Sequence, residues 1–299
     1  MKVIVILRLF YSFGLVFPEV QIRIKMSQYK LKESFNEMQS KEKYDYWGKQ
    51  VSRGNFSSGY KDYIVEKMEW ETLKNAIAKH IPNSRKVRVL EIGCHVGFST
   101  EKLYNFLGAN SYKAIDISDS SIKAANHYKH VNDFSGVDLQ IASATDIPDA
   151  AGSFDVLFSL RCIQNITHLS GQKKTLMEIH RTLASVGKAF IIENWQEDLD
   201  GLNSLRKLVN MNEINSPSHT KFLQKSELRE IISEYFDILE EIYFASAYYF
   251  GTRFAKWLAP DSSVNNLEDI HNEFYRVVKQ DNFKLKLGPS LLILQKKIL

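Results

Sequence analysis

The sequence has few cysteines, no long apolar run and little excess of either charge. Of its 299 residues only Cys94 and Cys162 are cysteines. Two thiols cannot build a disulfide framework or a cysteine-rich zinc site, so we expect no metal and a reducing, cytoplasmic location. The formal net charge is +4, and the charged residues are spread along the chain. That distribution argues against a dedicated nucleic-acid binder, which concentrates basic residues in a stripe.

The first 26 residues form an N-terminal extension with a basic start and a short apolar stretch. Arg8 interrupts the stretch, and Pro18 and Glu19 end it, so it is too short to span a bilayer as a helix. No small-residue cleavage site follows, which argues against a secretory signal. We interpret residues 1–26 as dispensable, with Met26 as an alternative start. Contact with a membrane surface is the less favoured interpretation.

Apolar strands alternate with amphipathic helices through the middle of the chain. The expected strands are 87–93, 111–117, 137–142, 153–160 and 188–194, and the helices between them are 99–107, 121–131 and 172–183. Such alternation predicts a parallel sheet with helices on both faces. Helical spacing of apolar residues predicts further helices over 67–81 and 225–236. Two more strands are expected at 236–250 and 289–297.

A glycine turn follows the first of these strands. Gly93 and Gly97 have a GxxxG spacing, which places backbone N–H groups and a helix N-terminus beside a ligand. The dinucleotide fingerprint GxGxxG is absent because His95 stands at its second glycine, which argues against NAD or FAD. Asp116 ends the second strand, where an acid can accept hydrogen bonds from both ribose hydroxyls. Its alternative role is a helix N-cap, although Ser118 could serve there instead.

The successive segments VLEIGCHVGFST, AIDIS, ASATDIP, SFDVLFSL and RTLASVGKAFIIEN resemble the motifs of class I S-adenosylmethionine-dependent methyltransferases, over about 85–195. The resemblance implies an α/β, Rossmann-like seven-stranded sheet, mostly parallel with an antiparallel last strand. It also implies S-adenosyl-L-methionine as the cofactor. We therefore divide the rest of the chain into a helical N-terminal lid over 27–84 and a methyltransferase domain over 85–299. Cap insertions are expected at about 196–224 and, between the last two strands, 248–288.

The same resemblance implies a set of cofactor-binding residues. They are Glu91, Gly93, Cys94, Gly97, Asp116, Ile117, Ser143, Ala144, Thr145, Leu160 and Arg161. The residues around the first turn would line the methionine half, and those after the second and third strands would contact the ribose and adenine. Leu160 and Arg161 would border the sulfonium. Two positions depart from the common pattern: His95 replaces the middle glycine of GCGxG, and Ser143 replaces an acid.

The fourth strand carries the features that bear on the substrate. It ends in SLRCIQNITHL and lacks the (N/D)PP(Y/F) tetrapeptide of methyltransferases that act on nucleobase or protein-glutamine amino groups. Together with Glu193-Asn194 and Tyr248-Tyr249-Phe250…Arg253, this segment resembles a bacterial group of small-molecule or glycan-associated methyltransferases. The predicted substrate-binding residues are Asn165, Tyr248, Tyr249 and Arg253. Their alternative roles are packing for the tyrosines and ion pairing within the cap for the arginine.

Three residues are candidate bases, because a hydroxyl acceptor must lose a proton whereas an amine acceptor has no such requirement. His95 and His168 are predicted near the transferred methyl, and the alternative for each is a packing or surface role. Glu193 ends the fifth strand, where carboxyl ends face the ligand crevice.

The sequence therefore predicts a methyltransferase that acts on a hydroxyl, carboxyl or amine of a small molecule, sugar or lipid-linked intermediate. One alternative is an RNA or other nucleic-acid methyltransferase. Another is a non-catalytic cofactor-binding protein with the same fold. The modest charge argues against the first, and the glycine turn with Asp116 argues against the second. We expect no nucleic-acid partner, and the acceptor atom and oligomeric state stay open.

Overall fold

The computed structural model describes residues 63–81, 87–109, 111–258 and 286–298. Within them the strands are β1 (Arg88–Ile92), β2 (Ser111–Asp116), β3 (Val137–Ile141), β4 (Phe154–Leu160), β5 (Leu183–Glu193), β6 (Phe236–Tyr243) and β7 (Ser290–Lys296). The helices are α3 (Tyr63–His80), α4 (Phe98–Leu107), α5 (Asp119–Asn132), α6 (Leu169–Thr182), α7 (Gln196–Leu208), α8 (Lys225–Tyr235) and α9 (Ser246–Leu258). A 3-10 turn, η1 (Ile163–Asn165), follows β4.

The strands form one sheet in the order β3-β2-β1-β4-β5-β7-β6. Neighbours from β3 to β5 are parallel, and β7 runs antiparallel to both β5 and β6. This confirms the predicted sheet, mostly parallel with an antiparallel last strand. The chain leaves β1 toward one edge of the sheet and returns to β4 beside it. In such sheets the carboxyl ends at this reversal form the ligand crevice.

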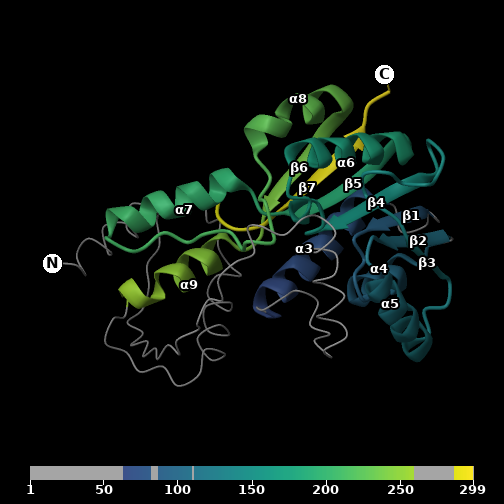
Figure 1. The fold of residues 1–299 in the computed structure, drawn as a ribbon, viewed down its shortest axis with the longest axis horizontal. Coiled ribbons are helices and arrows are strands. Elements are labelled where there is room, and N and C mark those ends of the chain that lie inside the picture. The colour runs from purple at the N-terminus through teal and green to yellow at the C-terminus, as the bar shows by residue number, and fades with distance from the viewer. Residues whose placement is uncertain (1–62, 82–86, 110, 259–285, 299) are drawn as a thin grey trace.

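Helices cover both faces of the sheet (Figure 1). On one face, Leu73 of α3, Leu103 of α4 and Ile122 of α5 belong to a single apolar cluster with the sheet. On the other face, Leu176 of α6 and Leu228 of α8 belong to a second cluster. Strands covered on both sides are apolar at successive positions, which explains the uninterrupted runs that predicted β1, β4 and β5.

Helices α7 and α9 extend away from the sheet (Figure 1). Leu202 of α7, Phe254 of α9 and Leu287 form a small apolar cluster of their own. The prediction of one strand over 236–250 is wrong in its second half, because β6 ends at Tyr243 and α9 begins at Ser246. The buried positions 248, 251 and 254 recur every three residues, which is helical spacing.

Several predictions concern residues outside the described ranges. These residues are the extension 1–26, most of the predicted lid and much of the second predicted cap insertion. Helix α3 is the part of the predicted lid that lies within the described ranges. Among the helices in the described ranges, none combines the length and apolar character needed to cross a bilayer.

Candidate active site

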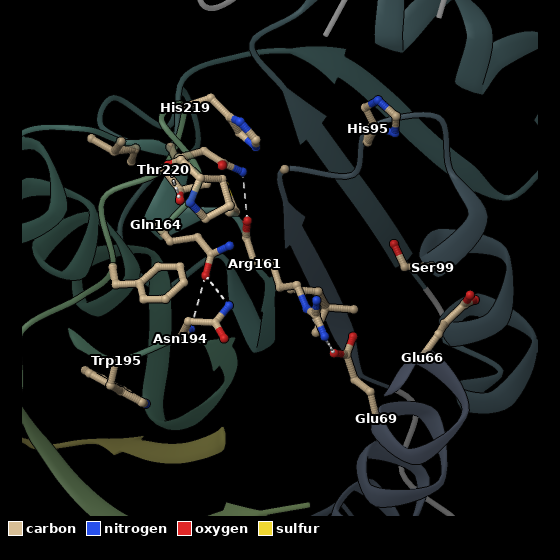
Figure 2. A pocket seen from close by; sticks show the side chains of 18 of the residues that line it. Glu66, Glu69, His95, Ser99, Arg161, Gln164, Asn194, Trp195, His219 and Thr220 are labelled. Carbon is tan, nitrogen blue, oxygen red and sulfur yellow. Dashed lines mark hydrogen bonds and ion pairs between the residues drawn. The ribbon is translucent and has the colours of Figure 1, made fainter. Parts of the chain in front are cut away.

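A cavity of about 700 Å³ opens at the carboxyl ends of the central strands. Its turn side is built from residues within 93–99, 116–117 and 142–145, and its cap side from residues within 164–168, 194–202, 214–222 and 249–253. Leu160 and Arg161, at the end of β4, also line it. In Figure 2, His95 and Ser99 mark the turn side, and Gln164, Asn194 and Trp195 mark the cap side. The cavity therefore lies where the sheet topology predicts a ligand.

The turn after β1 has a left-handed backbone at three positions. Gly93 has φ +75° and Gly97 has φ +91°, and His95 between them has φ +50°. A Cβ atom at Gly93 would stand 2.5 Å from the Cys162 sulfur, so no side chain fits there. The left-handed conformation at His95 is one that glycine adopts more readily than residues with a side chain.

Asp116 is held in place by two backbone amides. The His95 N–H donates to its Oδ2 at 3.0 Å, and the Ser118 N–H donates to its Oδ1 at 2.9 Å. Burial raises the pKa of Asp116, and these amide hydrogen bonds oppose that rise. Each carboxylate oxygen keeps acceptor capacity for a ligand hydroxyl. Ser118 caps α5 through its hydroxyl, so the helix-cap alternative for Asp116 is wrong.

The rest of the turn side suits a nucleoside. Ile117 is 39% exposed, which leaves an apolar surface at the cavity wall. Ser143 and Thr145 share a hydrogen bond of 2.8 Å between their hydroxyls, and Ala144 lies between them. An apolar face beside hydroxyl groups matches a flat purine with a polar edge. These residues therefore fit the adenosine part of S-adenosylmethionine.

Two predicted cofactor residues do not line the cavity. Glu91 is almost fully buried and accepts hydrogen bonds from the Ser99 hydroxyl at 2.6 Å and the Tyr112 hydroxyl at 2.9 Å. Burial raises its pKa, and those hydrogen bonds oppose the rise. Gly97 forms the N-cap of α4. In this structure Glu91 supports Ser99, which does line the cavity, and Gly97 shapes the turn. Direct cofactor contact by either residue stays a prediction.

Both histidine candidates line the cavity, in different settings. Burial lowers the pKa of His95 to about 4, so its imidazole is neutral at neutral pH. His168 caps α6, and its Nδ1 accepts the Gly171 N–H at 2.9 Å. Its Nδ1 is therefore occupied, and only Nε2 could act on a ligand.

Glu193 does not reach the cavity, although it was predicted as a base. Its carboxylate accepts the N–H groups of Ile163 at 2.8 Å and Gln164 at 3.1 Å, and it is fully buried. Burial raises the pKa of Glu193 to about 8, and the amide hydrogen bonds oppose that rise. The side chain therefore holds η1 in place. The amides of η1 thus take up the carboxylate, and a role of Glu193 as a base stays a prediction.

Arg161 forms an ion pair with α3. Its Nη2 lies 2.8 Å from Glu69 Oε2, and its Nε lies 3.2 Å from the same oxygen (Figure 2). Burial raises the pKa of Glu69, and the Arg161 guanidinium opposes the rise. Arg161 has φ +57°, so the chain turns sharply at the end of β4. It borders the cavity, with its charge balanced by Glu69, and its predicted place beside the sulfonium stays a prediction.

The four predicted substrate residues divide between the cavity and the core. Asn165, Tyr249 and Arg253 line the cavity, and the Arg253 guanidinium lies 4.0 Å from the centroid of the Tyr249 ring. The Asn165 side chain donates to the Arg161 carbonyl at 2.9 Å. Tyr248 is fully buried in a cluster with α3 and does not line the cavity. Helical geometry turns the adjacent tyrosines to different sides, and substrate binding by Tyr248 stays a prediction that its burial does not support.

Sequence reasoning missed several cavity residues. Gln164, Asn194 and Asp198 lie on the cap side, and Glu66 and Glu69 contribute from α3. Burial raises the pKa of Asp198 to about 6, and Lys225 opposes the rise. Gln164 lies within the segment SLRCIQNITHL, and Asn194 follows the candidate base Glu193. Their positions in these segments were the only sequence feature that pointed to the cavity.

Comparisons with known proteins agree with this geometry. The family profile described as "Methyltransferase domain" matches residues 83–237, more than half of the chain. The chain belongs to the class I S-adenosylmethionine-dependent methyltransferases. S-adenosylmethionine is the cofactor implied by this family, and the turn side of the cavity fits it.

Curated relatives match part of the chain. The tRNA U34 carboxymethyltransferase of Campylobacter concisus is 28% identical over 47% of each chain. The ajmaline N-methyltransferase of Rauvolfia serpentina is 28% identical over 40% of each chain. The chloroplastic tocopherol O-methyltransferase of Arabidopsis thaliana is 26% identical over 49% of this chain and 44% of that protein. The chain thus spans less than half the length of these relatives.

Solved structures share the fold at low identity. The Haloferax volcanii methyltransferase in complex with the Trm112 activator has a TM-score of 0.54 and 17% identity, over 85% of this chain and 98% of that one. The N-methyltransferase NodS of Bradyrhizobium japonicum, in complex with S-adenosyl-L-homocysteine, has a TM-score of 0.52 and 12% identity, over 86% and 99%. At these identities the likeness establishes the fold alone.

Proposed function

We propose that this methyltransferase moves a methyl group from S-adenosylmethionine to a hydroxyl, carboxyl or amine of a small molecule, sugar or lipid-linked intermediate. The observation that carries the proposal is the Asp116 carboxylate, fixed by two amides beside a left-handed glycine turn at the cavity wall. In the same proposal, residues 27–84 form a lid, and the insertions at 196–224 and 248–288 form a cap around the acceptor.

The turn side supplies the groups that would hold the cofactor. Asp116 would accept the ribose hydroxyls, and the exposed face of Ile117 would pack on the adenine. Ser143 and Thr145 would contact the adenine edge with their hydroxyls. The bound cofactor would supply a methyl group on a positively charged sulfur. A nucleophile on the acceptor can attack that methyl carbon, and the sulfur then leaves as a neutral thioether. The chain then contributes chiefly position, by holding the acceptor in the cavity that Leu160 and Arg161 line.

A hydroxyl acceptor must lose a proton to a group in the cavity, whereas an amine that enters in its neutral form can attack without one. His95 is the histidine candidate on the turn side, and its imidazole is neutral at neutral pH. Its low pKa makes it a weak base, because a general base is most effective when its pKa lies near the working pH. His168 offers only Nε2, since its Nδ1 accepts the Gly171 N–H.

Calorimetric titration with S-adenosylhomocysteine tests the proposal. We expect the unaltered chain to bind it, and Asp116→Ala to weaken binding by roughly 10- to 100-fold, because a charged acceptor of hydrogen bonds is lost. Asp119→Ala is the matched control: this nearby acid is exposed and pairs with Lys123. We expect that variant to bind like the parent. Absence of binding by the unaltered chain would overturn the proposal.

A second function is favoured by one relative, since the Campylobacter protein is named as a tRNA-modifying enzyme. A nucleic-acid methyltransferase would bind tRNA with an affinity that falls steeply as salt increases. The small-molecule proposal predicts no such binding, and it is supported by relatives named for ajmaline and tocopherol. Filter binding of tRNA at two salt concentrations distinguishes the two functions.

A further inference from the structure

Two side-chain amides form a hydrogen-bonded pair on the cap side of the cavity. The Asn194 Nδ2 donates to the Gln164 Oε1 at 2.8 Å, and the Asn194 backbone N–H donates to the same oxygen at 3.1 Å (Figure 2). Gln164 follows β4 in η1, and Asn194 follows β5. Both residues line the cavity, yet they are only 7% and 9% exposed. The pair is thus a nearly buried polar feature of the cavity wall.

The orientation of both amides is fixed by the backbone. A backbone N–H can only donate, so the Gln164 atom that receives it must be the carbonyl oxygen. The Asn194 atom bonded to that oxygen must then be the amide nitrogen. Hydrogen bonds of the backbone also hold the two residues in place. The Gln164 backbone N–H donates to the Glu193 carboxylate at 3.1 Å. The backbone N–H groups of Lys221 and Leu223 donate to the backbone carbonyls of Gln164 and Asn194, respectively.

One donor and one acceptor are left over. In the described part of the chain, the Gln164 Nε2 and the Asn194 Oδ1 make no hydrogen bond, and neither atom is completely buried, so both can be reached from the cavity. Two titratable residues next to the pair are engaged, because Glu193 binds the amides of η1 and Arg161 pairs with Glu69. Asp198, also on the cap side, has Lys225 and the Tyr243 hydroxyl beside its Oδ1. Nearly buried polar atoms are normally paired with protein, water or ligand. The pair therefore offers a neutral donor and a neutral acceptor to whatever enters.

We propose that this pair binds a neutral hydroxyl group of the methyl acceptor, which makes the acceptor an alcohol or a sugar-like molecule. A hydroxyl accepts one hydrogen bond and donates another, so it satisfies both the Gln164 Nε2 and the Asn194 Oδ1. An ammonium only donates and a carboxylate only accepts, so each leaves one amide atom unpaired in a nearly buried site. The inference rests on the proposed function, because the cofactor must occupy the turn side.

Three small probes with the same ring test the inference. The full chain, saturated with S-adenosylhomocysteine, is titrated with cyclohexanol, cyclohexylamine and cyclohexanecarboxylate at neutral pH, and binding is followed by NMR. We expect cyclohexanol to bind at least about fivefold more tightly than either charged probe. Equal binding, or preference for a charged probe, would overturn the inference. Failure to bind S-adenosylhomocysteine in the first place would instead overturn the proposed function.

Gln164→Glu is the sharpest variant. It keeps the oxygen that accepts both Asn194 bonds and replaces only the free donor with a carboxylate oxygen. We expect its preference to change from cyclohexanol to cyclohexylamine, which is an ammonium at this pH, with affinity for S-adenosylhomocysteine unchanged. Gln140→Glu is the control, since Gln140 pairs with Asp138 on β3 away from the cavity. If Gln164→Glu folds and still prefers cyclohexanol, the inference is wrong. If Gln164→Glu does not fold, the three probes on the unaltered chain decide the inference.

Discussion

At the level of single residues, the turn after β1 depends on the missing side chain at Gly93. Its φ of +75° is unfavourable for residues with a Cβ, and Cys162 fills the space beside it. The left-handed conformation of Gly93 and its close contact with Cys162 place the backbone of Gly93 and Cys94 against the cavity. Gly93 and Cys94 both line the cavity. A methyl group there must move either the turn or the end of β4.

Gly93→Ala is therefore expected to reduce stability by about 1–3 kcal/mol and to weaken S-adenosylhomocysteine binding. Urea denaturation and calorimetry measure the two effects. Gly201→Ala is the control, since Gly201 lies inside α7 with open space around it. Alanine favours a helix more than glycine does, so this change should leave stability equal or slightly higher. Normal binding by Gly93→Ala would show that the turn does not contact the cofactor.

Glu193 makes a prediction about pH. Burial raises its pKa from 4.5 to about 8, so between these values the folded chain holds a proton that the unfolded chain releases. Unfolding then releases a proton, and this contribution to stability decreases as pH rises from about 5 to 8. Gln cannot titrate, so Glu193→Gln should show a smaller decrease over that range. Denaturation of both proteins at pH 5, 6, 7 and 8 measures the difference, and parallel curves would contradict it.

The positions of residues were predictable where local pattern decides them. Asp116 was expected at the end of β2 beside the glycine turn, and the structure places it at the cavity wall between two amides. Glu193 was expected to face the crevice because it ends a strand. Whether a side chain at that position faces the ligand or the loop depends on which amides need an acceptor. The amides of η1 are 30 residues away in sequence, so spacing alone does not reveal them.

At the level of elements, α3 is attached to the sheet by apolar packing and by one buried ion pair. Leu73 and Ile77 pack in the core cluster, while Glu69 pairs with Arg161 at the end of β4. Glu69 also lines the cavity, so the position of α3 determines one of its walls. Removal of one partner from a buried pair leaves the other charge uncompensated.

Glu69→Ala is expected to reduce stability by about 3 kcal/mol, because the Arg161 guanidinium loses its counter-charge. Glu71→Ala, on the same helix, removes an exposed pair with Lys74 and should change stability by less than about 0.5 kcal/mol. Chemical denaturation of both variants gives the comparison. Equal effects would show that the buried pair contributes no more than a surface contact.

Elements were predictable where burial is continuous. The apolar runs at 87–93 and 188–194 predicted β1 and β5 within a few residues, apart from an earlier start of β5. The segment 236–250 was harder, because FASAYYF has the aromatic composition of a strand, but its last five residues, SAYYF, fold as the start of α9. Tertiary packing against α3 and α7 decides its structure, since Tyr248 and Phe254 each fill a separate cluster. Helix α7 was missed because its polar sequence has few apolar positions.

At the level of the whole molecule, the cavity joins parts of the chain that are far apart in sequence. Residues from α3, the strand ends, α7 and α9 all line it. A ligand that contacts these walls stabilises the folded state as one unit. At a free concentration of 100 times its Kd, S-adenosylhomocysteine should add about 2.7 kcal/mol to the free energy of unfolding. Thermal or chemical denaturation measures the gain, and Asp116→Ala should reduce it at the same ligand concentration.

The position of β7 has a consequence for how the protein is made. This strand follows all the others of the described sheet in sequence, yet it lies between β5 and β6 and pairs with both. While the ribosome is still translating the segment before residue 290, β6 has no neighbour and the edge of β5 is open. Exposed edges invite pairing with other chains. Nascent molecules should thus depend on rapid completion or on chaperones, and a ribosome stalled just before this strand should yield aggregating chains.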